Sequence, residues 1–99
     1  MKDKFIITIG TWGQRHYNYP KRKSPTVINV MRLEGKLEQY LRDLDRDAEE
    51  MFSQLVKQLA AIDGIAEALK TTNQMEWVRQ MNGIRNRAEE IVNKELIYV

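Results

Sequence analysis

Apolar side chains recur at steps of three and four residues along a segment that runs from Lys36 to Ile62. No glycine or proline interrupts this segment, and its outer face carries charged pairs such as Glu38 and Arg42, whose i, i+4 spacing stabilises a helix. Its apolar positions are Leu37, Leu41, Leu44, Ala48, Met51, Phe52, Leu55, Leu59 and Ile62. The pattern predicts one amphipathic helix of about 27 residues, roughly 40 Å long at about 1.5 Å per residue.

A second helical pattern extends from about Gln74 to Leu96. Residues 71–73 precede it and are Thr, Thr and Asn, which are candidate helix caps. Its apolar stripe consists of Trp77, Met81, Ile84, Ala88 and Ile91, with Val78 and Val92 along one edge. We expect this second long helix to pack antiparallel to the first.

One charged residue lies on the apolar edge of the second helix. Arg85 is seven residues from each of the two edge valines, so it points along the same side. In an antiparallel pair, Asp45 or Glu49 on the first helix would face Arg85 and bind its guanidinium, and pairing with Glu89 on its own helix is the alternative. Each of these pairs would set the register of the helices more than their stability.

A shorter helix is predicted ahead of the first long one. Ser24 is a favourable N-cap and Pro25 suits the first helical position, where its missing N–H costs nothing, so this helix runs to about Leu33. Gly35 permits a break before the long helix, and Gly64 supplies a left-handed cap after it.

The predicted fold class is all-α, with two long amphipathic antiparallel helices plus one or two short helices over residues 25–99. One narrow partner helix leaves part of the apolar surface of the long helices uncovered. We therefore expect a homodimer that completes a helix bundle.

The first 24 residues differ in composition from the rest. Lys4–Ile9 has the composition of a strand, and the glycines and prolines that follow favour irregular structure. Residues 1–32 contain seven Lys or Arg and one acidic residue, whereas residues 33–99 contain nine basic and thirteen acidic residues. We expect a basic, mostly irregular N-terminal arm over residues 1–24, joined to a more acidic helical domain.

The arm is the candidate nucleic-acid interface. Cations attract phosphates and aromatic rings stack on bases, and the arm interleaves its basic residues with Trp12, Tyr17 and Tyr19. The alternative is that these aromatic rings cover the hydrophobic core while the cations keep the arm hydrated. The predicted nucleic-acid-binding residues are Arg15, His16, Lys21, Arg22, Lys23, Arg32 and Lys36.

No residue pattern indicates catalysis or a metal site. The chain has one histidine and no cysteine, which excludes disulfides, thiol catalysis and Cys-ligated zinc. We expect no enzymatic activity, no cofactor and no metal. The lack of cysteine fits the cytoplasm, and no segment approaches the ~20 apolar residues that span a bilayer, so we expect no membrane contact.

The C-terminal segment resembles the signature of the TnpV family, small proteins encoded on bacterial transposons and integrative elements. "GKLEQYLRDLD" and "LVKQLAAIDGIAEALK" also look like family segments, and the resemblance extends over about residues 10–99. The shared C-terminal positions are Gln74, Met75, Trp77, Val78, Met81, Asn82, Ile84, Arg85, Asn86, Arg87, Ala88, Glu89, Glu90, Ile91, Val92, Glu95, Leu96 and Tyr98.

The resemblance implies an accessory protein of a transposon or conjugative element, likened to excisionase-type factors. It transfers no catalytic or DNA-reading residue to this chain. With the basic arm, it leads to the hypothesis of a non-enzymatic factor that binds DNA and assists excision or recombination. The alternative is a protein-interaction or regulatory module that binds the recombinase of the element without contacting DNA.

Overall fold

The computed structural model of this chain describes residues 3–19 and 25–99, and every regular element in that part is helical. The elements in chain order are η1 (Lys4–Thr8), α1 (Thr11–Tyr17), α2 (Pro25–Leu33), α3 (Leu37–Ile62), α4 (Glu67–Thr72), α5 (Gln74–Val92) and η2 (Asn93–Ile97). The predicted all-α class is therefore confirmed. None of these helices combines the length and the apolar content needed to cross a bilayer.

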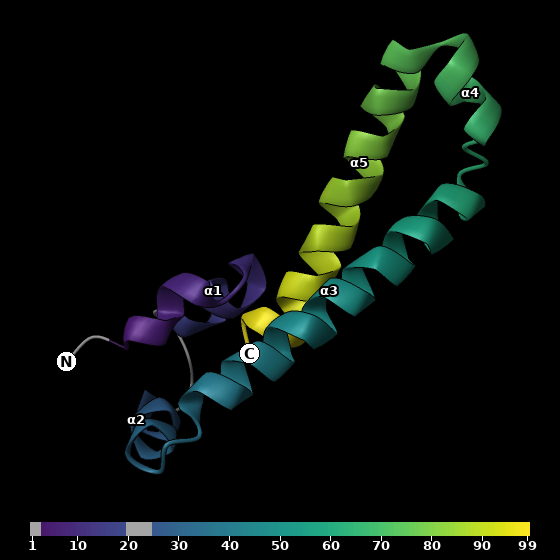
Figure 1. Ribbon diagram of the computed structural model, residues 1–99. Coiled ribbons are helices and arrows are strands. Elements are labelled where there is room, and N and C mark those ends of the chain that lie inside the picture. The colour runs from purple at the N-terminus through teal and green to yellow at the C-terminus, as the bar shows by residue number, and fades with distance from the viewer. Residues whose placement is uncertain (1–2, 20–24) are drawn as a thin grey trace.

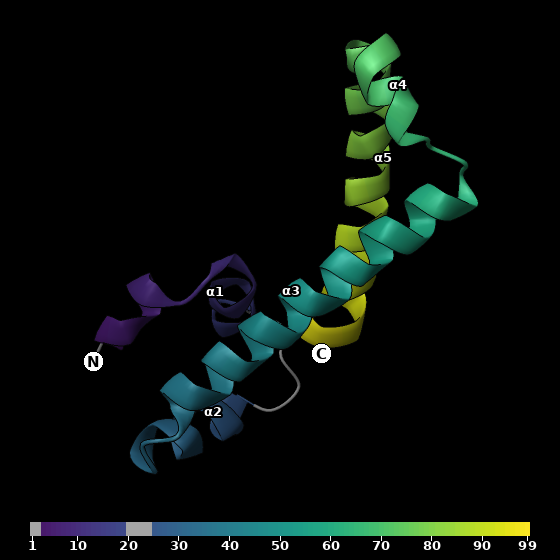
Figure 2. The same ribbon diagram turned by 45° about the vertical axis from the view of Figure 1, so that its right-hand side comes forward.

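The two long helices, α3 and α5, form an antiparallel pair as predicted (Figure 1). Gly35 and Gly64, with φ of 73° and 70°, take the left-handed conformation on either side of α3, which is why this helix begins and ends where the sequence indicates. The helices meet near the C-terminus of the chain and diverge toward α4, which closes the far end (Figures 1 and 2).

The buried hydrophobic residues lie at the end where α3 and α5 meet. One cluster consists of Ile9, Ile28, Leu37 and Leu41, and the other of Trp12, Ala48, Val92 and Ile97. At the far end, no residue from Glu49 to Gly83 is buried. We call this segment, residues 49–83, the distal hairpin.

The N-terminal segment differs from its sequence-based expectation. The strand interpretation of Lys4–Ile9 is wrong, because this stretch forms η1 and its apolar residues pack on α2 and α3 instead of on a strand. Residues 11–17, expected to be irregular, form helix α1, which packs against α3 and η2. Residues 4–17 are thus part of the helical core and are not a separate arm.

The molecule is elongated, with extents of 54 × 24 × 18 Å. Its radius of gyration is 17.0 Å, whereas a compact chain of this length has about 13 Å. The divergence of α3 and α5 along the distal hairpin accounts for this shape (Figure 2).

Candidate functional site

Helix α1 is held on α3 by two carboxylates that lie one turn apart. The Gly13 backbone N–H donates to Oδ1 of Asp45 at 2.9 Å, and Nε1 of Trp12 donates to Oε2 of Glu49 at 2.9 Å. The Trp12 ring is buried and its centroid lies 5.6 Å from that of Phe52. Gly13 allows this approach because a Cβ there would lie 3.0 Å from the backbone oxygen of Leu41.

The opposite side of α1 binds the C-terminal part of the chain. Arg15 forms an ion pair with Glu89 at 3.0 Å, donates to Oδ1 of Asn93 at 2.8 Å and lies over the Trp12 ring. His16 is buried, with Nδ1 2.7 Å from the Ile97 carbonyl oxygen. A carbonyl oxygen only accepts hydrogen bonds, so Nδ1 carries the proton and donates it. Helix α1 thus joins α3 to α5 and η2.

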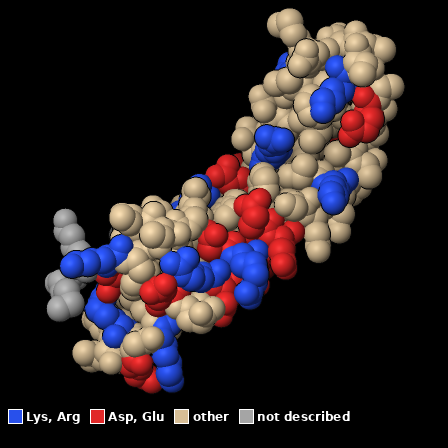
Figure 3. All heavy atoms as spheres, in the orientation of Figure 1, with Lys and Arg blue, Asp and Glu red and all other residues tan. Residues whose placement is uncertain are grey.

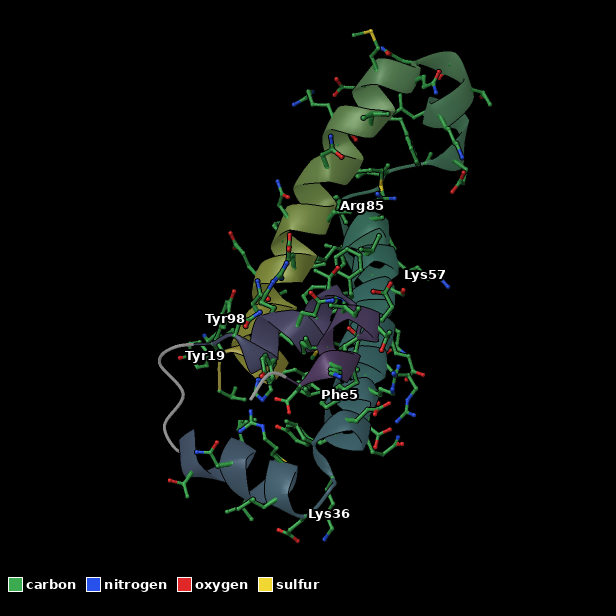
Figure 4. The ribbon with its side chains drawn as sticks, turned by 60° about the vertical axis from the view of Figure 1, so that its left-hand side comes forward. Phe5, Tyr19, Lys36, Lys57, Arg85 and Tyr98 are labelled. Carbon is green, nitrogen blue, oxygen red and sulfur yellow. The ribbon has the colours of Figure 1, made fainter. Side chains whose placement is uncertain are left out.

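Aromatic contacts extend this junction on both sides. Nε2 of His16 lies 3.0 Å from the Tyr40 hydroxyl of α3. The rings of Tyr19 and Tyr98 lie 5.0 Å apart, so the end of the α1 segment also contacts the end of the chain (Figure 4). The arm aromatics therefore cover the core, which was the alternative to base stacking.

Arg32 of α2 binds the N-terminal segment. Its Nη2 lies 2.8 Å from Oδ2 of Asp3, which also accepts from the Tyr17 hydroxyl at 2.7 Å. Only 7% of the Asp3 side chain is exposed. The hydrogen bond from Arg32 is the main cause that lowers the pKa of Asp3, and the same carboxylate raises the pKa of Tyr17.

The predicted nucleic-acid-binding residues do not form one free basic surface in the described part of the chain. Arg15, His16 and Arg32 have the intramolecular partners given above. Lys36 is exposed and pairs with Glu34 at 3.1 Å. On the face seen in Figure 3, basic side chains are interspersed with acidic ones. Lys21, Arg22 and Lys23 lie outside the described residues.

Arg85 lies where α5 passes α3 (Figure 4), but it forms none of the predicted ion pairs. Among residues 3–19 and 25–99, no carboxylate forms a salt bridge with it; Asp45 and Glu49 accept from α1 instead, and Glu89 binds Arg15. The sequence did not reveal α1 as the competing partner. These groups surround an open pocket of about 410 Å³, lined by Gly10, Thr11, Trp12, Arg15, Asp45, Glu49, Phe52, Arg85 and Glu89.

The distal hairpin carries a second open pocket beside Gly83 and Ile84. The pocket measures about 670 Å³, and Arg87 and Asp63 form an ion pair of 2.5 Å at its edge. At the start of α5, hydrogen bonds from Arg79 lower the pKa of Glu76 to about 2. No group of three His, Cys, Asp or Glu residues in the described ranges is placed to hold a metal ion.

The fold and its contacts define a small all-α protein in which Asp3, Arg15 and Arg32 join helical segments to one another. The family model described as transposon-encoded protein TnpV matches residues 1–97, and the chain belongs to this family. No curated protein and no solved structure matches the chain.

Replacing Gly13 by Ala should displace α1 from α3, because the new methyl group meets the Leu41 carbonyl and the Ile9 side chain. We expect a loss of about 1–3 kcal/mol in the free energy of unfolding, measured by urea denaturation. Gly83→Ala is the matched control: nothing lies within 4 Å of its Cβ, so it should gain about 0.5–1 kcal/mol from helix propensity. Equal effects of the two substitutions would contradict the close approach of α1.

Replacing Asp3 by Asn should remove a pH-dependent part of the stability. The pKa of Asp3 is lowered in the folded state, so its stabilising effect is present above the unfolded pKa of about 3.9 and is lost as the pH falls through the folded pKa. Urea denaturation from about pH 5 to pH 2 should show a steeper fall for the wild type than for D3N. Asp47→Asn, at an exposed position of α3, should follow the wild type; coincidence of D3N with both would refute this role of Asp3.

Proposed function

We propose that this chain is a non-enzymatic accessory protein that assists excision or recombination of its transposon in the cytoplasm, and that it acts by protein–protein contact through the distal hairpin. Membership in the transposon-encoded TnpV family supports the link to a mobile element. The observation that carries the contact is the apolar surface left uncovered between residues 49 and 83.

The hairpin leaves several large apolar side chains exposed to solvent or only half-buried. Ile62 is 78% exposed and Val78 is 42% exposed, while Leu55, Leu59 and Trp77 are only half-buried. Burial of apolar area is favourable by about 25 cal/mol per Å², and contiguous apolar patches on a protein surface mark interaction sites. Burial of the hairpin against a protein partner would therefore be favourable in free energy.

The charged groups of the α1–α3–α5 pocket support a structural role over a catalytic one. A general base needs a carboxylate or imidazole that is free to accept a proton from a substrate. Here Asp45 and Glu49 accept from α1, Glu89 binds Arg15, and the buried His16 bridges Ile97 and Tyr40. Each of these groups already holds one helix to another.

DNA binding by the basic segment is the second candidate. Three consecutive cations, Lys21, Arg22 and Lys23, favour it, and Lys36, with its side chain 71% exposed, lies on the linker that follows α2. Neutralising phosphates with such cations releases counterions, so this contact would be salt-dependent.

Disrupting the distal hairpin should impair movement of the element. In cells that carry the transposon, we expect Ile62→Glu and Val78→Glu to lower the frequency of the excised junction at least about tenfold, measured by quantitative PCR, because a charge cannot be buried unpaired in a protein interface. Both side chains are exposed in the chain itself, so the variants should keep their helical circular dichroism.

The matched control is Leu33→Glu, at an aliphatic residue that is 88% exposed at the end of α2, away from the hairpin. It should excise like the wild type. Unchanged excision in the two hairpin variants would refute the proposed contact. Capture of the element's recombinase by the wild type in the absence of DNA, lost in Ile62→Glu, would support the recombinase as a partner.

Binding of short DNA duplexes tests the second candidate. If Lys21, Arg22 and Lys23 contact phosphates, replacing all three by Gln should reduce the slope of log affinity against log salt by about 2.7. As a control, replacing Lys57, Lys70 and Lys94 by Gln changes the net charge by the same amount. This variant should retain most of the slope of log affinity against log salt. Equal slopes for the wild type and the first variant would exclude DNA contact by these residues.

A further inference from the structure

We infer that a second copy of this chain covers the distal hairpin, and that the two hairpins pack around a two-fold axis to complete a four-helix bundle. This inference rests on the proposed use of the hairpin as a protein contact and names the partner. Two observations support a second copy: the amount of exposed surface and the placement of the exposed apolar residues.

The exposed surface exceeds what a monomer of this size needs. The accessible surface of the chain is 7127 Å², whereas a folded monomer of 11.7 kDa has about 5,900 Å². A standard protein–protein interface buries about 800 Å² on each partner. The excess is therefore large enough to form a stable interface, and the distal hairpin is where it lies, because no residue there is buried.

The hairpin exposes large apolar side chains on both of its long helices. Ile62 at the end of α3 is 78% exposed, and Met75 and Val78 on α5 are 85% and 42% exposed. The two helices diverge here (Figure 2), and the apolar side chains that precede and follow these positions are only partly buried. A two-fold interface brings the same face of each copy together, and two such hairpins make the four helices of an ordinary bundle.

The molar mass of the full-length chain in solution tests the inference. Light scattering and sedimentation equilibrium should give twice the 11.7 kDa of the chain at micromolar concentration. Ile62→Glu and Val78→Glu should each raise the dimer dissociation constant about a hundredfold, because each places an unpaired charge in the interface. Leu33→Glu, the matched control at the opposite end of the molecule, should dimerise like the wild type.

Different experimental results would contradict the second copy as the partner and the proposed function. A chain that stays monomeric up to about 100 μM, or a dimer that neither hairpin substitution weakens, would overturn the second copy as the partner. If such a monomer still captures the recombinase through the hairpin, the proposed function stands without the dimer. If Ile62→Glu abolishes the dimer but leaves excision unchanged, the dimer stands and the proposed function fails.

Discussion

The contact between α1 and the acidic edge of α3 is the interaction on which the rest of the structure depends. Asp45 and Glu49 each accept one hydrogen bond from α1, from the Gly13 backbone and from the Trp12 indole. Once α1 is fixed there, Arg15 and His16 reach the C-terminal part of the chain and tie it down. Each hydrophobic cluster includes a residue in or next to α1, Ile9 in one and Trp12 in the other, so this contact links both clusters.

The same contact changes the electrostatic character of the N-terminal segment. The cations of a basic segment attached to an acidic body can bind either an external polyanion or the body itself. Among the described residues, both cations bind carboxylates of the same chain: Arg15 binds Glu89 of the acidic body, and Arg32 binds the buried Asp3 of the segment itself. Because these carboxylates hold the cations within the fold, the net charge of the segment overstates how much of it faces a ligand.

In the distal hairpin, by contrast, the chain does not fully cover its own apolar side chains. Its helices carry the apolar periodicity of a core but enclose none, because α3 and α5 diverge and α4 is too short to fill the space between them. An amphipathic face gains free energy only when it is covered. A protein built with a well-packed end and an uncovered end suits a role in which assembly with another protein matters, as in the function proposed above.

The sequence by itself determined the helices whose limits depend on local chemistry. Pro25, Gly35 and Gly64 mark helix limits through backbone conformation, and the periodicity of α3 and α5 specifies their antiparallel pairing. Only the tertiary structure decided the conformation of residues 4–17 and the partner of Arg85. Lys4–Thr8 is helical, and its apolar residues pack against α2 and α3 rather than on a strand. Asp45, Glu49 and Glu89 bind α1, and Arg85 has no salt bridge among the described residues. Local propensity cannot show which distant group wins such a competition, since that depends on contacts between residues far apart in the chain.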